Sequence, residues 1–261
     1  MKEFGTYFGK FERTDLSLTF RSEEKITNQA TNFIMQNEAQ IPKSVSAIRK
    51  SQNPSVFISF KKQSNKEENF IDAQDHLSEI MGHIASEASE NNKPEVLVLG
   101  RYNLDTYNRA FSIDYKTILA GMQKKFPDQE ITFKTVHRSK GLEADYVIIL
   151  EVVNDFLGFP NEQADDHILD LVLAKSEAFP NSEERRLFYV ALTRAKKKVF
   201  VSTTSGMSSE FVDEVIQSPF DCEIWGRKSA LLPSCSKCVE GKLLLKTSEF
   251  GSFWGCNNHP Y

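Results

Sequence analysis

Apolar segments and amphipathic segments alternate along the first 204 residues, and this order restricts the folds that the chain can adopt. Residues 96–99 (VLVL) and 146–153 (YVIILEVV) are nearly continuous apolar runs, which is the pattern of strands buried on both faces of a parallel sheet. Residues 70–89 place apolar side chains at helical spacing, and residues 114–126 are predicted to form another helix. The alternation predicts an α/β fold with a parallel, doubly wound sheet and helices on both faces.

The two ends of this alternating region have more specific local patterns. Apolar and polar residues alternate over residues 16–20, which predicts a strand, and Ser22 can cap a helix that follows it. Asn181 and Glu184 have the spacing of a capping box, which predicts a helix that continues to Lys196. A final apolar strand is expected to close the sheet.

Composition excludes several classes of protein. A chain of 261 residues can hold one large domain with a small appendage. No apolar run approaches the roughly 20 residues of a membrane span, so we expect no contact with a membrane. The net charge is -4, so any contact with nucleic acid must come from a local groove. Cys-x-x-Cys spacing suits metal ligands in a reducing compartment, so we expect a cytoplasmic protein.

Two arginines are candidates for chemistry at the edge of the sheet. Arg194 follows Leu187 by seven residues on the helix expected after Asn181, so it should lie near the apolar stripe. A partly buried arginine needs an anion, either a carboxylate of the protein or the phosphate of a ligand. Arg21 follows the strand predicted over residues 16–20, which would place it at the carboxyl edge of the sheet, where α/β folds bind ligands. Two arginines on one phosphate would stabilise charge that develops during phosphoryl transfer.

A polar loop precedes the apolar run at residues 146–153 and offers several ligand-binding groups. Gly141 permits close approach of the backbone, and Glu143, which we expect to be buried, can accept a hydrogen bond from a ribose hydroxyl. Four further side chains offer donors for a nucleic-acid backbone: Thr135, His137, Ser139 and Lys140. Each is also an ordinary loop residue, so their grouping is the informative feature. No G-x-x-x-x-G-K-[ST] motif is present, so the chain looks like half of a nucleotide site.

These segments together resemble a known family. Residues 135–149 (TVHRSKGLEADYVII) resemble motif V of the superfamily 1 DNA helicases of the UvrD/Rep type. Residues 183–195 (EERRLFYVALTRA) resemble motif VI of the same family. Residues 18–22 (LTFRS) look like motif IV, and residues 98–103 (VLGRYN) look like a looser motif IVa. Motifs V and VI are highly specific in combination, and the resemblance extends over about the first 205 residues.

The resemblance implies the second RecA-like motor domain of an ATP-dependent 3′–5′ DNA helicase. Arg21 and Arg194 would contact the γ-phosphate of ATP, and Gly141 and Glu143 would touch the nucleotide. Single-stranded or partial duplex DNA would be held by Thr135, His137, Ser139 and Lys140. ATP with Mg²⁺ would be bound mainly by an N-terminal RecA-like domain that has the P-loop. The chain would then be a C-terminal fragment, inactive without that partner domain.

Two departures from the family pattern affect what can be transferred. Only 27 residues separate Asn103 from Ile131, where helicases of the UvrD/Rep type have a large insertion subdomain, so we expect that subdomain to be absent. Motif V reads GLEAD where many relatives have GLEF, and Ala144 cannot fill a phenylalanine site.

The last residues have the spacing of a zinc site. Cys235 and Cys238 are followed by Cys256 after seventeen intervening residues, which predicts a zinc ribbon with bound Zn²⁺. His259 is the candidate for the fourth ligand. This segment resembles the C-terminal zinc fingers of bacterial type I topoisomerases, which end in a fourth cysteine. A cysteine-rich tail that binds no metal is the alternative.

The patterns divide the chain into four parts: a lead-in segment (1–15), a RecA-like domain (16–205), a helical connector (206–233) and a truncated zinc-ribbon-like finger (234–261). A second function stays open, in which a non-catalytic module uses the helicase fold and the ribbon to bind nucleic acid or protein. Arg21 and Arg194 favour the helicase, because a binding module does not need them.

Overall fold

The structure is a computed structural model. It describes residues 4–10, 12, 14, 16–41, 44–51, 53–62, 64–65, 68–88, 93–161, 179–220, 222–226, 243–248 and 251–256.

Six strands form a central sheet in the order β5-β4-β6-β7-β3-β8, and every neighbouring pair is parallel. The strands are β3 (Val56–Lys61), β4 (Glu95–Gly100), β5 (Glu130–Thr135), β6 (Ala144–Ile149), β7 (Ala195–Thr204) and β8 (Glu223–Gly226). The apolar runs of the sequence became the inner strands β4 and β6, as their two-sided burial requires. The predicted α/β fold with a parallel sheet is therefore confirmed.

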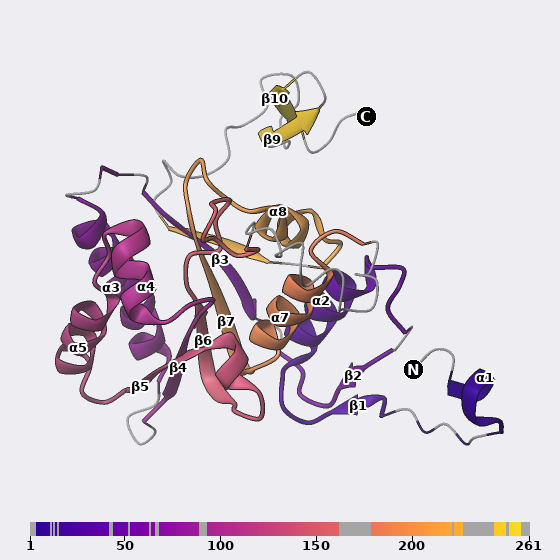
Figure 1. The fold of residues 1–261 in the computed structure, drawn as a ribbon. Helices are drawn as coiled ribbons and strands as arrows, with labels where there is room; N and C mark the ends of the chain where they lie inside the picture. Colours follow the sequence, from indigo (N-terminus) through magenta and orange to yellow (C-terminus); the bar gives the residue numbers. More distant parts are fainter. Residues whose placement is uncertain are drawn as a thin grey trace.

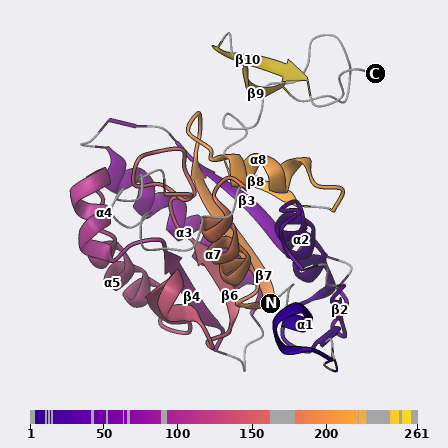
Figure 2. The same cartoon turned by 45° about the vertical axis from the view of Figure 1, so that its right-hand side comes forward.

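Helices cover both faces of this sheet (Figures 1 and 2). One face packs against α3 (Asn69–Glu87), α4 (Leu104–Phe111) and α5 (Tyr115–Lys125), and the other packs against α2 (Glu24–Met35), α7 (Ser182–Leu192) and α8 (Glu210–Gln217). The pleat of β4 assigns the faces, because Val96 and Val98 join the core under α3 and α5. Leu97 and Leu99 join the core under α2 and α7.

Two short helices occupy the place where the family pattern has a large insertion. Asn103 caps α4 by accepting a hydrogen bond from the Thr106 amide at 2.9 Å, and Asp114 caps α5 in the same way. Both helices pack directly on the sheet, and the absence of the insertion subdomain stays a prediction. Ala144 is buried at the start of β6 and pairs with Ala195 of β7, so its small side chain fits a tight junction of two strands.

Two sequence predictions about element boundaries were wrong. The strand predicted over residues 16–20 is only β1 (Leu18–Thr19), and it pairs with β2 (Ser46–Ala47) in a separate two-stranded sheet. Its apolar side faces solvent, with Leu18 57% and Phe20 69% exposed, so the alternation did not signal burial in the main sheet. The helix predicted to reach Lys196 ends at Leu192, because the following residues pair with β6 and β3 as β7. The lead-in also contains a short helix, α1 (Phe4–Phe8).

A buried polar cluster lies where β3 and β6 end. The Lys61 ammonium is 2.6 Å from a carboxylate oxygen of Glu151, and the Tyr115 hydroxyl donates to the same oxygen. Both charged side chains are nearly inaccessible to solvent. His76 lies nearby and shares a 3.0 Å hydrogen bond with Ser202, and its burial, followed by the charge of Lys61, lowers its pKa to about 4. The pattern of apolar runs gave no indication of this cluster.

The tail is described only in part. β9 (Leu243–Ser248) and β10 (Gly251–Cys256) form an antiparallel pair that is drawn apart from the central sheet (Figure 1). Cys235, Cys238 and His259 lie outside the described residues, and nothing is described of the side chain of Cys256. The zinc site therefore stays a prediction. Within the described ranges no group of three His, Cys, Asp or Glu residues suits a metal ion, and no helix there is long and apolar enough to cross a bilayer.

Candidate functional site

The loop between β5 and β6 has a fixed backbone. A single 3₁₀ turn (Val136–Ser139) is followed by a type II β-turn, in which Lys140 has φ -58° and ψ 123° and Gly141 has φ +88°. The Leu142 amide closes this turn by donating to the Ser139 carbonyl at 2.9 Å. A Cβ on Gly141 would meet no atom within 4 Å, so glycine is needed here for its positive φ and not for space.

Burial sorts the side chains of this loop into two groups. Val136 and Ser139 are fully buried, and the Ser139 hydroxyl donates to the Val136 carbonyl at 2.7 Å. His137, Lys140 and Gly141 are exposed, and Thr135 is half-buried. Ser139 therefore anchors the loop, whereas the other predicted nucleic-acid residues lie at the surface.

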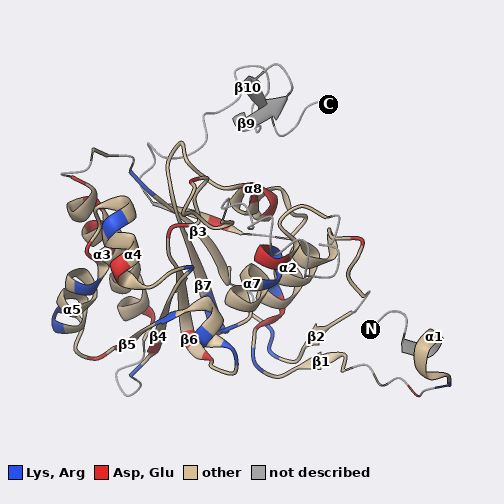
Figure 3. Cartoon of the chain, viewed as in Figure 1, with Lys and Arg blue, Asp and Glu red and all other residues tan. Residues whose placement is uncertain are grey.

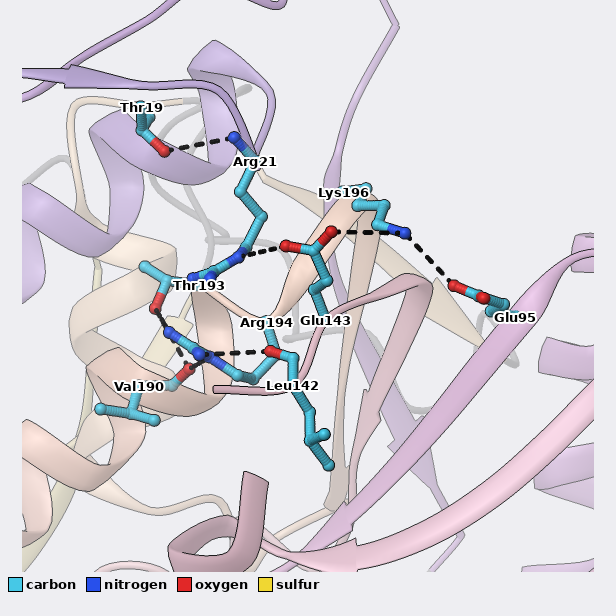
Figure 4. Close-up of polar contacts among 9 residues, drawn as sticks. All are labelled: Thr19, Arg21, Glu95, Leu142, Glu143, Val190, Thr193, Arg194 and Lys196. Atoms are coloured by element: carbon cyan, nitrogen blue, oxygen red, sulfur yellow. Dashed lines mark hydrogen bonds and ion pairs between the residues drawn. The ribbon is translucent and has the colours of Figure 1, made fainter. Parts of the chain in front are cut away.

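Arg194 is buried, as predicted, but by a different arrangement. It follows the end of α7, and its side chain turns back so that Nε donates to the Val190 carbonyl at 2.9 Å. Nη1 donates to the Leu142 carbonyl at 3.2 Å, and Nη2 donates to the Thr193 hydroxyl at 3.2 Å (Figure 4). By donating to these neutral acceptors, the guanidinium caps the last turn of α7 and ties it to the β5–β6 loop. Among the described residues, no carboxylate pairs with this guanidinium.

Arg21 reaches the same place from the β1–β2 sheet. Its Nε donates to Glu143 Oε2 at 2.8 Å, and Lys196 Nζ lies 3.5 Å from Glu143 Oε1 and 3.2 Å from Glu95 Oε2 (Figure 4). The expectation that Arg21 marks the carboxyl edge of the sheet was wrong, because β1 is not part of that sheet. Glu23 donates its amide to the Lys196 carbonyl, so the start of α2 and Arg21 are held at the amino ends of β6 and β7.

The electrostatics of this edge favour an anion. The hydrogen bond from Arg21 and then the charge of Lys196 lower the pKa of Glu143, so this carboxylate is ionised. Burial and then the positive charge of Arg21 lower the pKa of Arg194, so the two guanidinium groups repel each other. Arg21, Arg194 and Lys196 meet Glu95 and Glu143 at this edge, which leaves one positive charge in surplus among these five side chains (Figures 3 and 4). Contrary to expectation, Glu143 is exposed, with 44% of its side chain accessible.

A second polar group lies at the carboxyl end of β4. Arg101 forms a bidentate ion pair with Glu184 of α7, with N···O distances of 3.1, 2.9 and 2.7 Å. The predicted capping box was therefore wrong, because Glu184 binds Arg101 and Asn181 adopts a left-handed backbone without a side-chain cap. Burial and then the charge of Arg101 lower the pKa of His137, so its imidazole is neutral at neutral pH.

Several residues of this site were missed from the sequence. Lys196 was expected at the end of a helix, but it belongs to β7 and binds Glu143. Arg101 and Glu184 were noted only as parts of a motif and a capping box. The ring of Phe20, which precedes Arg21 in the sequence, is exposed, whereas the alternation had suggested a buried strand residue. Arg101 comes just after an apolar strand, and this was the only local signal in the sequence that could have indicated it as a site residue.

The arrangement agrees with comparisons to known proteins. Residues 102–206 match the UvrD-like helicase C-terminal domain, a segment that runs from the end of β4 through the β5–β6 loop and α7 to β7. This segment of the chain is therefore similar to the C-terminal domain of UvrD-like helicases.

Individual relatives agree with this class. The chain is 32% identical over 212 residues to DNA helicase IV of Escherichia coli strain K12, which covers 80% of this chain and 27% of that protein. It is 38% identical over 113 residues to a probable DNA helicase II homolog of Mycoplasma pneumoniae, which covers 42% of this chain and 14% of that protein. The chain thus spans about a quarter or less of the relatives that it matches.

One solved structure can be set beside the fold. The crystal structure of the C-terminal domain of a possible DNA helicase from Lactobacillus plantarum WCFS1 superposes with a TM-score of 0.46 at 15% identity. The superposition covers 79% of this chain and 98% of that one.

Proposed function

We propose that this chain is the second motor domain of an ATP-dependent 3′–5′ DNA helicase. It supplies arginines to ATP and a loop to single-stranded DNA, while a separate RecA-like domain holds the nucleotide with its P-loop. The family match and the similarity to proteins named DNA helicase support this assignment. The chain alone is inactive, because half of the nucleotide site comes from the other domain.

The observation that carries the proposal is that Arg21 and Arg194 lie close together. The two residues come from segments far apart in the sequence and contact the adjacent residues Glu143 and Leu142, just before β6. Arg194 is 9% exposed and is held by two carbonyls and a hydroxyl, which fix its direction without neutralising its charge. A buried, oriented and unneutralised guanidinium suits the γ-phosphate of ATP, whose charge it would stabilise during transfer.

The other groups at this edge fit a nucleotide but not its metal. Glu143 projects to solvent and can accept a hydrogen bond from a ribose hydroxyl while Arg21 turns to phosphate. Phe20, which precedes Arg21 in the sequence, has an exposed ring that offers an apolar surface to a base. Glu95 and Glu143 are both engaged by Lys196, so the carboxylates that would hold Mg²⁺ must come from the P-loop domain.

Thr135, His137 and Lys140 are the residues that we assign to DNA. His137 and Lys140 are exposed on a loop with a fixed backbone, so binding needs to order only their side chains and not the loop. A neutral His137 can donate one hydrogen bond and accept another, and Lys140 adds a positive charge for phosphate. Ser139 keeps its place in the hydrophobic interior and positions this loop.

The loop joins the two ligands through its backbone. Thr135 and His137 precede the type II turn, Lys140 lies within it, and the Leu142 carbonyl at its end accepts a hydrogen bond from Arg194. A shift of the loop on DNA binding would therefore act on the arginine that faces the γ-phosphate. Coupling of DNA binding to ATP hydrolysis follows from this connection.

Replacing Arg194 tests the proposal. With the chain joined to a P-loop domain, Arg194→Ala should lower kcat for DNA-stimulated ATP hydrolysis by about 10³-fold or more, which is the usual effect of losing an arginine finger. Affinity for single-stranded DNA should stay near that of the unchanged protein. Arg109→Ala is the matched control, since this exposed arginine lies on α4.

Full ATPase activity in Arg194→Ala would contradict the arginine assignment. Tight DNA binding by the chain alone, unaffected by His137→Ala, would instead favour a non-catalytic binding module.

We also propose that Cys235, Cys238, Cys256 and His259 bind Zn²⁺. One equivalent of zinc, lost on Cys238→Ser, is the expected result, and a metal-free protein would exclude it.

A further inference from the structure

The ion pair between Arg101 and Glu184 connects the two ends of the proposed motor site. Glu184 lies in the first turns of α7, and both partners are mostly buried, with 16% and 11% of their side chains exposed. Glu184 accepts three hydrogen bonds from Arg101 and a fourth, at 3.1 Å, from the Asn161 amide. A carboxylate used in this way fixes the guanidinium plane as well as its charge.

The backbone under Arg101 is also fixed. The Arg101 amide donates to the Tyr107 hydroxyl at 2.8 Å, and its guanidinium lies 5.1 Å from the centre of the Tyr102 ring. A Cβ on Gly100 would lie 2.7 Å from the Tyr107 ring and 2.9 Å from the Tyr102 carbonyl, so only glycine fits before this turn. The backbone of Arg101 is therefore fixed, and the orientation of its guanidinium depends on the contact with Glu184.

Both ends of α7 are consequently tied to functional groups. Near its start, Glu184 holds Arg101. Helix α7 and strand β4 both pack against the 3₁₀ turn that contains His137, and the charges of Arg101 and Glu184 act on its imidazole. At its end, the Val190 carbonyl and Thr193 hold Arg194. Glu184 and Val190 are six residues apart on α7, so roughly 9 Å of helix separates the two contacts.

We infer that Glu184 is a positioning residue that couples the DNA-facing loop to Arg194 through α7. Its ion pair with Arg101 makes α7 move with the carboxyl end of β4 and the His137 surface. DNA bound at that surface thus acts on Arg194 by a second route, in addition to the Leu142 carbonyl. This inference rests on the proposed helicase function and adds a residue to its coupling.

The geometry is tested in this chain without any second domain. Glu184→Gln removes a charge that raises the pKa of His137, and Arg101→Met removes one that lowers it. We expect the His137 pKa, measured by NMR titration, to fall in Glu184→Gln and to rise in Arg101→Met. Glu214→Gln is the matched control, because Glu214 pairs with Arg185, the neighbour of Glu184 on α7. An unchanged His137 pKa in both test variants would show that Arg101 and Glu184 do not act on His137, and this would overturn the inference.

The coupling is tested with the chain joined to a P-loop domain. Glu184→Gln should reduce the stimulation of ATP hydrolysis by single-stranded DNA about tenfold, within the usual range of coupling between sites. The basal rate and KM for ATP should not change. Arg101→Met should have the same effect, and the double variant should lose no more than either single variant.

The outcomes separate this inference from the proposed function. If Arg194→Ala abolishes hydrolysis but Glu184→Gln keeps full stimulation, the coupling role of Glu184 is wrong and the helicase assignment stands. If Glu184→Gln lowers the basal rate and the stimulated rate equally, Glu184 has only a structural role. If Arg194→Ala stays active, the proposed function itself fails.

Discussion

The buried pair of Lys61 and Glu151 gives a stability prediction that follows from geometry alone. Glu151→Gln keeps the shape of the side chain and an acceptor for the Tyr115 hydroxyl, but it leaves the Lys61 ammonium without its anion. Both side chains are at most 4% exposed, so water cannot solvate the ammonium that is left without its partner. Breaking a buried pair by removing one partner costs about 3–5 kcal/mol. We expect the free energy of unfolding to fall by roughly that amount.

Urea denaturation followed by far-UV circular dichroism measures this effect. With an m-value of about 2–3 kcal/mol/M, a loss of about 4 kcal/mol lowers the midpoint by roughly 1.3–2 M urea. The control is Lys61→Met combined with Glu151→Gln, which removes both charges. Replacing a buried pair by neutral groups is often close to neutral, so this double variant should recover most of the lost stability.

Two results would refute the reasoning. One is a midpoint in Glu151→Gln within about 0.3 M of the unchanged protein, which would mean that the pair is solvated or contributes little. The other is a double variant less stable than either single variant, which would mean that packing and not charge dominates this site.

Three further predictions concern pH, the ligand edge and a close contact. The native pKa of His76 is about 4 against 6.5 in the unfolded chain, so the stability that it contributes is present above pH 6.5 and is lost as pH falls toward 4. His76→Gln should reduce the loss of unfolding free energy between pH 6.5 and 4.5 by roughly 2–3 kcal/mol in urea titrations, and an equal loss would contradict the burial argument. Glu143→Gln should weaken the contact with Arg21 by removing its charge and should abolish most of the stimulation of ATP hydrolysis by DNA, so unchanged stimulation would count against the loop as coupler. Gly100→Ala should cost about 1–3 kcal/mol in thermal unfolding because of the contact with Tyr107, and a neutral effect would show that this ring moves freely.

The sequence predicted the core of the fold because local periodicity decides it. The inner strands and the helices over residues 70–89 and 114–126 follow from apolar runs and helical spacing that agree with their burial. The end of α7 could not be predicted in this way. Residues 194–198 (RAKKK) are good helix formers, and only pairing with β6 and β3, which are distant in sequence, makes them a strand.

The candidate site was predicted in its members more than in its geometry. Arg21, Glu143 and Arg194 were expected at one site, and the structure brings them together. The prediction that Arg21 lies at the carboxyl edge of the sheet was wrong. No local pattern distinguishes a strand of the main sheet from β1, which pairs with β2 alone. Glu184 fitted a capping box equally well, and only the fold shows that Arg101 competes for its carboxylate.

The claim that this chain supplies one half of an ATPase is tested most directly by adding it to a separately produced P-loop domain. ATP hydrolysis should be slow with the P-loop domain alone and should rise when the chain and single-stranded DNA are added. The Arg194→Ala chain should not produce this rise. Hydrolysis that does not respond to the chain, or that responds equally to the Arg194→Ala chain, would contradict the account.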